Sequence, residues 1–231
     1  MTPRFPSSPQ VKRPWPACLR TVLTAALCAP IPVTIVVVLD GCDDGSDELA
    51  GQYGPDVHFI SVDVHNVGTS RAVGFDYARS LLRGDTRSWF ATTDADSRVD
   101  PGWLVRQLSA GVDMVLGVVR VTDWRQHNAD VVDRYMRRYQ PDPADKHGDH
   151  EHIHGANMGF SAKAYWRVGG FRSLPTGEDV DLVERFEAAG YQIHRDTELS
   201  VITSARTQAR APLGFAHHLR QMGRTVAGDC V

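Results

Sequence analysis

The sequence predicts an α/β fold in which a mainly parallel sheet is flanked by helices. Three observations favour this class: apolar runs of strand length, helical periodicity between them, and acidic residues directly after two of the runs. The chain has 231 residues, of which 42% are hydrophobic and 23% charged. That length suits one α/β domain with a full core and is short for two. We therefore expect a single domain.

The first elements are a helix and two strands. Pro30 and Pro32 end an apolar helix over 16–29, and the β-branched run 33–39 that follows is typical of a buried strand. Residues 57–62 alternate apolar and polar side chains, as a half-buried strand does.

The middle of the chain continues the alternation. Apolar residues recur at helical spacing over 69–83, and the apolar run 88–93 predicts the next strand. A helix over 102–110 then leads to 114–121, a continuous apolar run typical of an inner strand. Successive strand and helix segments of this kind imply βαβ units and hence parallel pairing.

The second half is predicted to be less regular. Residues 123–140 form an amphipathic pattern with an apolar face, and 163–168 and 179–189 are shorter helical segments. The ends carry little apolar periodicity, so we expect an irregular tail over 1–14, with four prolines, and a tail or helix over 211–231. The domain is expected over 15–210.

Totals and targeting signals exclude several classes. A net charge of −3 gives no basic field for nucleic acid, and the four cysteines have no zinc-ligand spacing. The uncharged stretch 21–39 is about long enough to span a bilayer, but its two prolines favour a helix followed by a strand. A signal peptide is the rival reading, yet the apolar run continues past any plausible cleavage point. We expect a cytoplasmic protein with no transmembrane segment, and leave peripheral membrane contact open.

Asp94-Ala95-Asp96 is the most informative motif. The two carboxylates follow the strand 88–93 and can face one hard divalent cation, which prefers oxygen ligands. Short strings of this kind also occur as turn formers. Asp40 follows the strand 33–39 in the same way, and ligands bind beyond the carboxyl ends of parallel strands. Asp40 and the Asp94/Asp96 pair are therefore expected to share one crevice.

Six segments in order resemble the family 2 glycosyltransferases, which have the GT-A fold of nucleotide-diphospho-sugar transferases. Together these segments cover about residues 16 to 205. They are Asp40-Gly41-Cys42-Asp43-Asp44-Gly45-Ser46, Gly68 to Gly74, Asp94-Ala95-Asp96, Gly155-Ala156-Asn157-Met158-Gly159-Phe160, Gly169-Gly170-Phe171, and Gly177-Glu178-Asp179-Val180-Asp181-Leu182 with Arg185.

The resemblance implies a nucleotide-diphosphate sugar as donor, a hydroxyl acceptor, Mg²⁺ or Mn²⁺, and inversion at the anomeric carbon. Asp40 would receive the base or ribose and Arg71 would help hold the diphosphate. Asp94 and Asp96 would hold the cation against the diphosphate, with Asp96 the more direct ligand.

The same resemblance assigns the acceptor side. Asp179 would be the general base that removes the acceptor hydroxyl proton, while Glu178 shapes the site. Capping of the helix that they open is the structural alternative for both residues.

Two further groups of side chains are less specific. His152 and His154 could face one ion, or belong to a solvated loop. Many family members supply a late histidine as metal ligand, but the corresponding stretch 201–206 has none. Arg206 and Arg210 could contact the diphosphate or an anionic acceptor, or form a solvated basic tail.

The family's opening apolar strand is not recognisable in residues 1–14. Its loss would expose a sheet edge and remove part of the nucleotide floor. The alternative to an active transferase is therefore a degenerate, inactive binding domain. A sugar-phosphate nucleotidyltransferase would need a G-x-G-T-R loop, which is absent, and a processive synthase would need membrane helices.

Overall fold

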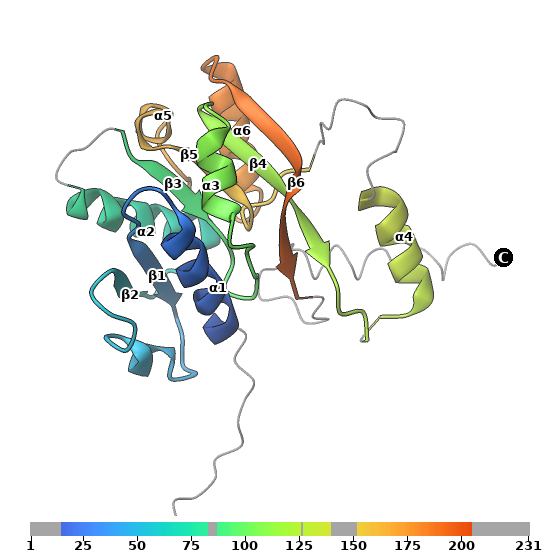
Figure 1. Cartoon of the computed structure of the whole chain (residues 1–231), viewed down its shortest axis with the longest axis horizontal. Helices are drawn as coiled ribbons and strands as arrows, with labels where there is room; N and C mark the ends of the chain where they lie inside the picture. Colours follow the sequence, from blue (N-terminus) through green and yellow to red (C-terminus); the bar gives the residue numbers. More distant parts are fainter. Residues whose placement is uncertain (1–14, 83–86, 126, 140–151, 205–231) are drawn as a thin grey trace, which may run out of the picture.

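The computed structural model describes residues 15–82, 87–125, 127–139 and 152–204. The expected tails at 1–14 and 211–231 lie outside these ranges, as do Arg206 and Arg210. Helices and strands alternate through the first half, in the order expected (Figure 1). The elements are α1 Trp15–Cys28, β1 Ile35–Asp40, the 3₁₀ turn η1 Ser46–Leu49, β2 Val57–Val62, α2 Val67–Leu81, β3 Trp89–Thr92, α3 Trp103–Ser109, β4 Met114–Val121, α4 Ala129–Tyr139, β5 Met158–Ser161, α5 Ala162–Arg167, α6 Glu178–Ala188 and β6 Ile193–Thr203.

The α/β class is confirmed, and the strand pairing is mixed. β1 pairs with β2 in parallel, and β4 pairs with β6 in parallel. β5 lies between β3 and β4 and is antiparallel to both. The sequence gives little signal for this insertion, because β5 spans only 4 residues. The described strands form two sheets, β1-β2 and β3-β5-β4-β6.

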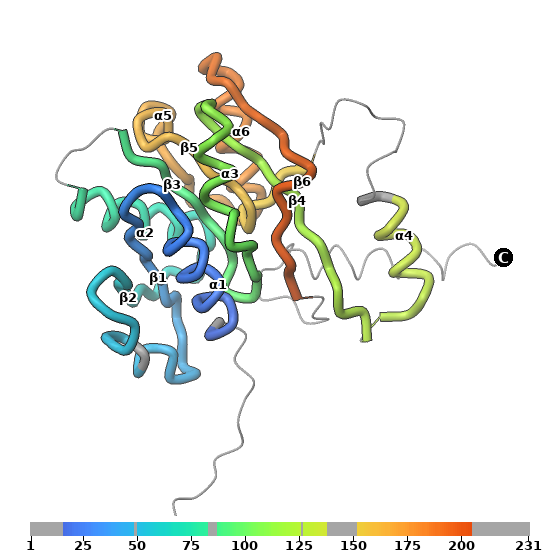
Figure 2. Tube along the Cα trace, in the orientation of Figure 1, coloured from blue at the N-terminus to red at the C-terminus, as the bar shows by residue number. Residues whose placement is uncertain are grey.

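Helices cover both faces of the larger sheet, as the traces in Figures 1 and 2 show. On one face, α2, α5 and α6 enclose a core centred on Phe160, Tyr165 and Phe186, all fully buried. On the other face, α1 and α3 pack Ala25 and Trp103 against the strands. A three-layer arrangement results, with the carboxyl ends of β1 and β3 near the start of α2.

Helices α1 and α2 each pack against both sheets. In α2, Gly74 packs against Val38 of β1, while the Phe75 ring lies 4.8 Å from that of Phe90 in β3. In α1, Leu19 packs in the apolar cluster that contains residues of β1 and β2. Within the described residues, β1 and β3 form no hydrogen-bonded ladder with each other. We call the unpaired boundary between these two strands the seam.

Most expected boundaries agree to within a few residues, and β2 and β4 agree at both ends. The largest difference is at α4, which begins at Ala129 and not at 123. The Asn128 side chain accepts a hydrogen bond from the Val131 amide at 3.1 Å and so caps the first turn. None of the helices in the described ranges has the length and the apolar character needed to cross a bilayer.

Candidate active site

The first turns of α2 contact acidic residues from three segments, Asp40, Asp94 and Glu178. The Ser70 hydroxyl donates to Asp40 Oδ2 at 2.8 Å. The next side chain, Arg71, forms ion pairs with Asp94 and Glu178. Segments that are far apart in sequence therefore meet around one helix terminus.

Asp40 holds the loop that leads into α2. Its carboxylate accepts hydrogen bonds from the amides of Val64 at 2.8 Å, His65 at 2.9 Å and Asn66 at 3.1 Å. Burial acts to raise the pKa of Asp40, but these bonds and that from Ser70 lower it below its ordinary value of 3.8. The loop places His65 at a φ of 48°, in the left-handed region. A contact between Asp40 and the nucleotide stays a prediction, because loop groups already bind this carboxylate.

A hollow of about 270 Å³ opens beside this loop, at the carboxyl ends of β1 and β2. Ligands of open α/β sheets bind at such ends. The lining residues are Leu39, Gly41, Cys42, Asp47, Ser61, Val62 and Asp63.

Asp94 and Asp96 lie in a tight turn after β3. The Ser97 amide donates to the Asp94 carbonyl at 2.9 Å and closes the turn. The end of β6 supplies Thr203, whose hydroxyl accepts from the Ser97 hydroxyl at 3.1 Å and lies 3.5 Å from Asp96 Oδ1. Thr203 thus stands near the acidic pair in the stretch that lacks the family's late histidine.

The Cys18 thiol lies beside the turn that contains Asp94 and Asp96. It donates to the Asp94 carbonyl at 3.3 Å. Burial, and after it the charges of Asp94 and Asp96, raise the pKa of Cys18 to about 12. The thiol is therefore protonated at neutral pH, and both carboxylates act on it.

Glu178 and Asp179 open α6. Gly177 precedes them at a φ of 75°, a conformation that favours glycine. Asp179 Oδ2 accepts from the Gly155 amide at 2.8 Å, and its Oδ1 accepts from the Val180 amide at 2.9 Å. The G-x-N block and the acceptor block are therefore in direct contact.

Arg71 links Asp94, which follows β3, to Glu178 at the start of α6. Its Nη1 lies 2.6 Å from Glu178 Oε1 and its Nη2 lies 2.8 Å from Asp94 Oδ1. The Arg71 and Glu178 side chains are 12% and 13% exposed, whereas that of Asp94 is 47% exposed. One guanidinium therefore separates the two carboxylates, and Asp94 keeps a solvent-accessible side.

Asn157 of the G-x-N block is buried and cross-links neighbouring strands. Its Oδ1 accepts from Trp103 Nε1 at 2.8 Å. Its Nδ2 donates to the carbonyls of Val118 at 2.9 Å and Leu199 at 2.8 Å. These bonds satisfy carbonyls beside an irregularity where β4 and β6 shift register after Gly117. Asn157 therefore shapes the sheet behind the site.

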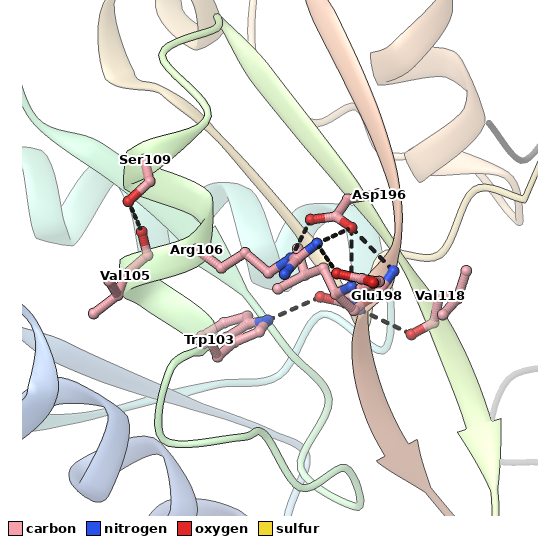
Figure 3. Close-up of polar contacts among 9 residues, drawn as sticks. Trp103, Val105, Arg106, Ser109, Val118, Asp196 and Glu198 are labelled. Atoms are coloured by element: carbon pink, nitrogen blue, oxygen red, sulfur yellow. Dashed lines mark hydrogen bonds and ion pairs between the residues drawn. The ribbon is translucent and has the colours of Figure 1, made fainter. Parts of the chain in front are cut away.

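An ion pair from the same helix α3 also holds this irregularity. Arg106 of α3 binds Asp196 through Nε at 2.5 Å and Nη2 at 2.9 Å, and Glu198 at 2.7 Å (Figure 3). The Asp196 carboxylate also accepts from the amides of Glu198 and Leu199. The last residues of β6, which include Thr203, are thereby directed toward Asp94 and Asp96.

The oxygen donors near the turn fit a hard cation. Asp94, Asp96 and Thr203 offer carboxylate and hydroxyl oxygens, and Mg²⁺ is commonly held by one or two carboxylates together with substrate phosphates. Across the described ranges, no group of three or more His, Cys, Asp or Glu side chains is arranged to bind a metal. The His152 and His154 rings stack with centroids 5.9 Å apart. A cation at Asp94 and Asp96 would thus need the donor phosphates to complete its shell.

A family model described as Glycosyl transferase family 2 matches residues 15–169, more than half of the chain. The chain belongs to glycosyl transferase family 2. The match begins at the start of α1 and includes the Asp94-Ala95-Asp96 turn and the Asn157 cross-link. No curated protein sequence matches this family 2 chain.

Solved structures similar to this family 2 chain support the GT-A fold. The mannosyltransferase PcManGT from Pyrobaculum calidifontis, solved with GDP-Man and Mn²⁺, has a TM-score of 0.56 and 18% identity over 85% of this chain and 55% of its own. A mycobacterial protein has a TM-score of 0.53 and 14% identity over 93% and 69%. TarS from S. aureus has a TM-score of 0.56 and 12% identity over 94% and 41%. This chain therefore spans about half the length of the first of these proteins.

The structure gathers most of the predicted site residues and adds others. Asp94, Glu178 and Asp179 meet around Arg71, and Asp40 lies at the same end of α2. Arg206 lies outside the described residues. The added residues are Asn66, Ser70, Gly155 and Thr203. Asn66 is the cap of α2 and could have been found from the capping preference of asparagine, whereas Ser70 and Thr203 carry no such signal.

Proposed function

We propose that this family 2 member is a metal-dependent glycosyltransferase that moves a sugar from a nucleotide-diphosphate donor to a hydroxyl acceptor with inversion. The observation that carries the proposal is the single guanidinium between Asp94 and Glu178, with Asp179 next in sequence. It brings residues suited to a cation next to a residue suited to take a proton. A cation assists departure of the diphosphate and a base assists attack of the acceptor hydroxyl in a single displacement at a sugar carbon.

On the donor side, Asp94 and Asp96 would hold Mg²⁺ or Mn²⁺. The bound cation would neutralise charge on the leaving diphosphate. Asp40 keeps the loop 63–66 in place, and the adjacent hollow would take the base or ribose. We propose that Arg71, and Arg206 from the chain beyond β6, favour the diphosphate through their positive charge.

On the acceptor side, Asp179 would be the general base. The acceptor oxygen would form the new bond to the anomeric carbon while the bond to the diphosphate breaks, and its proton would pass to Asp179. The Gly155 amide holds one oxygen of this carboxylate in place. Glu178, bound to Arg71, would fix the start of α6. Attack from the side opposite the leaving group inverts the anomeric centre.

We place this activity in the cytoplasm, with peripheral membrane contact open. In the part of the chain that the structure describes, Cys18 and Cys28 are free thiols, as is usual in reducing compartments. This inference is independent of the reaction.

The alternative is an inactive domain of the same fold. The observation that favours it is the seam between β1 and β3, the two strands whose carboxyl ends lead to Asp40 and Asp94. Such a domain would neither bind donors with a cation nor turn them over.

A donor screen separates the two. We would measure nucleoside diphosphate release from a panel of UDP, GDP and dTDP sugars, with Mn²⁺, with Mg²⁺ and with EDTA, in the presence of simple hydroxyl acceptors. Cation-dependent release from one donor, with inverted product by NMR, is the expected result. Absence of both calorimetric donor binding and release would favour the inactive domain.

A further inference from the structure

The Arg71 guanidinium is enclosed by groups from four segments. It leaves α2, meets Asp94 after β3 and Glu178 at the start of α6, and lies with Cζ 5.5 Å from the centre of the Phe171 ring. The fourth segment is the loop at Gly155, where an added Cβ would lie 2.3 Å from Nη1. Contacts on every side leave the guanidinium little freedom to turn.

The charges around Arg71 are unbalanced. Burial acts to lower its pKa, but the charges of Asp94, Glu178 and Asp179 together raise it above its ordinary value. The guanidinium therefore stays protonated, and its single positive charge faces three negatively charged carboxylates. If one of these carboxylates is neutralised, Arg71 interacts more strongly with the remaining carboxylates.

Gly155 makes this arrangement possible. Its missing side chain leaves the room that the guanidinium fills, and its amide binds Asp179 at 2.8 Å. An alanine here would have to displace Arg71, because its Cβ would also lie 2.5 Å from Cζ. The position of Arg71 and the anchoring of Asp179 thus depend on the same peptide.

We propose that Arg71 is a positioning residue that couples the cation carboxylate Asp94 to the acceptor-side pair Glu178 and Asp179. The inference rests on the proposed function and deepens it. A cation at Asp94 competes with Arg71 for that carboxylate, so the strength with which Glu178 holds Arg71 sets the affinity of the cation. Conversely, cation binding frees Arg71 to hold the start of α6 more firmly.

A thermodynamic cycle on Mn²⁺ affinity tests the coupling. Free Mn²⁺ would be measured by EPR during titration of the full chain, without a donor, for the native sequence, Glu178→Gln, Arg71→Met and the double variant. With Arg71 present, Glu178→Gln leaves the guanidinium to Asp94, and we expect Mn²⁺ affinity to fall about fivefold. With Arg71→Met, we expect Glu178→Gln to have less than a twofold effect.

The cycle separates coupling from direct charge. Loss of the Glu178 charge also weakens Mn²⁺ directly, but that effect would persist or grow without Arg71. Arg79→Met is the matched control, since Arg79 is an exposed α2 arginine that lies over Trp166, away from the carboxylates. In the Arg79→Met variant, Glu178→Gln should still lower the Mn²⁺ affinity about fivefold.

A second variant covers the case in which Arg71→Met does not fold. Gly155→Ala keeps every charge and displaces the guanidinium, so it should also abolish the effect of Glu178→Gln. Equal effects of Glu178→Gln with and without a correctly placed Arg71 would overturn the coupling and leave the proposed function standing. Absence of Mn²⁺ binding by the native chain without a donor would overturn the coupling alone, because in the proposed function the donor phosphates complete the shell of the cation and the donor screen decides that function.

Discussion

At the scale of single residues, the proposed cation site in the turn after β3 depends on Asp96. We expect Asp96→Ala to abolish metal-dependent donor binding, because one carboxylate of two is lost and Thr203 offers only a neutral hydroxyl. Calorimetry with Mn²⁺ and the donor from the screen measures this. Asp133→Ala, an exposed change on α4, is the control, and unchanged affinity in Asp96→Ala would contradict the prediction.

Asp179 is the second decisive residue. In Asp179→Asn, the amide oxygen can still accept from the Gly155 amide, so we expect donor affinity to be kept and turnover to fall about 10²- to 10⁴-fold. Single-turnover kinetics measures the transfer step. Glu184→Gln, an exposed change on the same helix, should leave it unaffected. Turnover at the native rate in Asp179→Asn would remove it as the base.

Asp196 predicts how stability depends on pH. Burial acts to raise its pKa, but the hydrogen bonds from Arg106 and two amides lower it below 3.8. A carboxyl with a lowered folded-state pKa contributes stability above about pH 4, which is lost as the pH falls through the folded-state pKa. We expect Asp196→Asn to cost about 1–3 kcal/mol at pH 7 and progressively less below pH 4. Urea unfolding from pH 7 to pH 3 checks this, and a difference independent of pH would contradict it.

At the scale of elements, the contact of α2 with β1 depends on Gly74. An added Cβ would lie 2.8 Å from Val38 Cγ2, closer than atoms pack. Although alanine is the better helix former by about 1 kcal/mol, we expect Gly74→Ala to destabilise the chain by about 1–3 kcal/mol. The compensating pair Gly74→Ala with Val38→Ala should recover part of this. Additive losses in the pair, measured by urea unfolding, would contradict the contact.

The elements also show where sequence reasoning reaches its limit. Continuous or alternating apolar runs predicted β2 and β4 at both ends. β6 was missed, because its first half is polar from His194 to Glu198 and its pairing is interrupted by the register shift. β5 was missed because so short a segment has no periodicity of its own. Strand pairing with distant residues, and not local pattern, determines both.

In the candidate site, too, local sequence pattern predicts some features and contacts between distant residues determine others. Motif residues such as Asp94 and Asp179 could be assigned to one candidate site from the sequence because their types carry chemistry, and their roles stay predictions. The position of Thr203 could not, because it depends on the register of β6. Likewise, the sequence suggests that Arg71 faces a diphosphate, whereas only the packing of α6 on α2 shows that it meets Glu178.

At the scale of the whole molecule, the seam between β1 and β3 predicts a response to an added strand. Joining an apolar, β-branched segment to the N-terminus through a flexible linker should let it pair with both edges under α1 and α2. We expect Tm to rise by about 4 °C or more, and the amides of β1 and β3 to exchange more slowly. An extension of equal length made of Gly and Ser is the control. Equal Tm values for the two extensions would contradict the prediction.

The seam has a consequence for cohesion. Because no ladder crosses it in the described residues, we expect β1 and β2 to open as a local unfolding unit more often than the larger sheet does. Under the proposed function, a donor bound both at the carboxyl ends of β1 and β2 and at the turn containing Asp94 would have to be released before this unit opens. Opening would become rarer in proportion to donor occupancy.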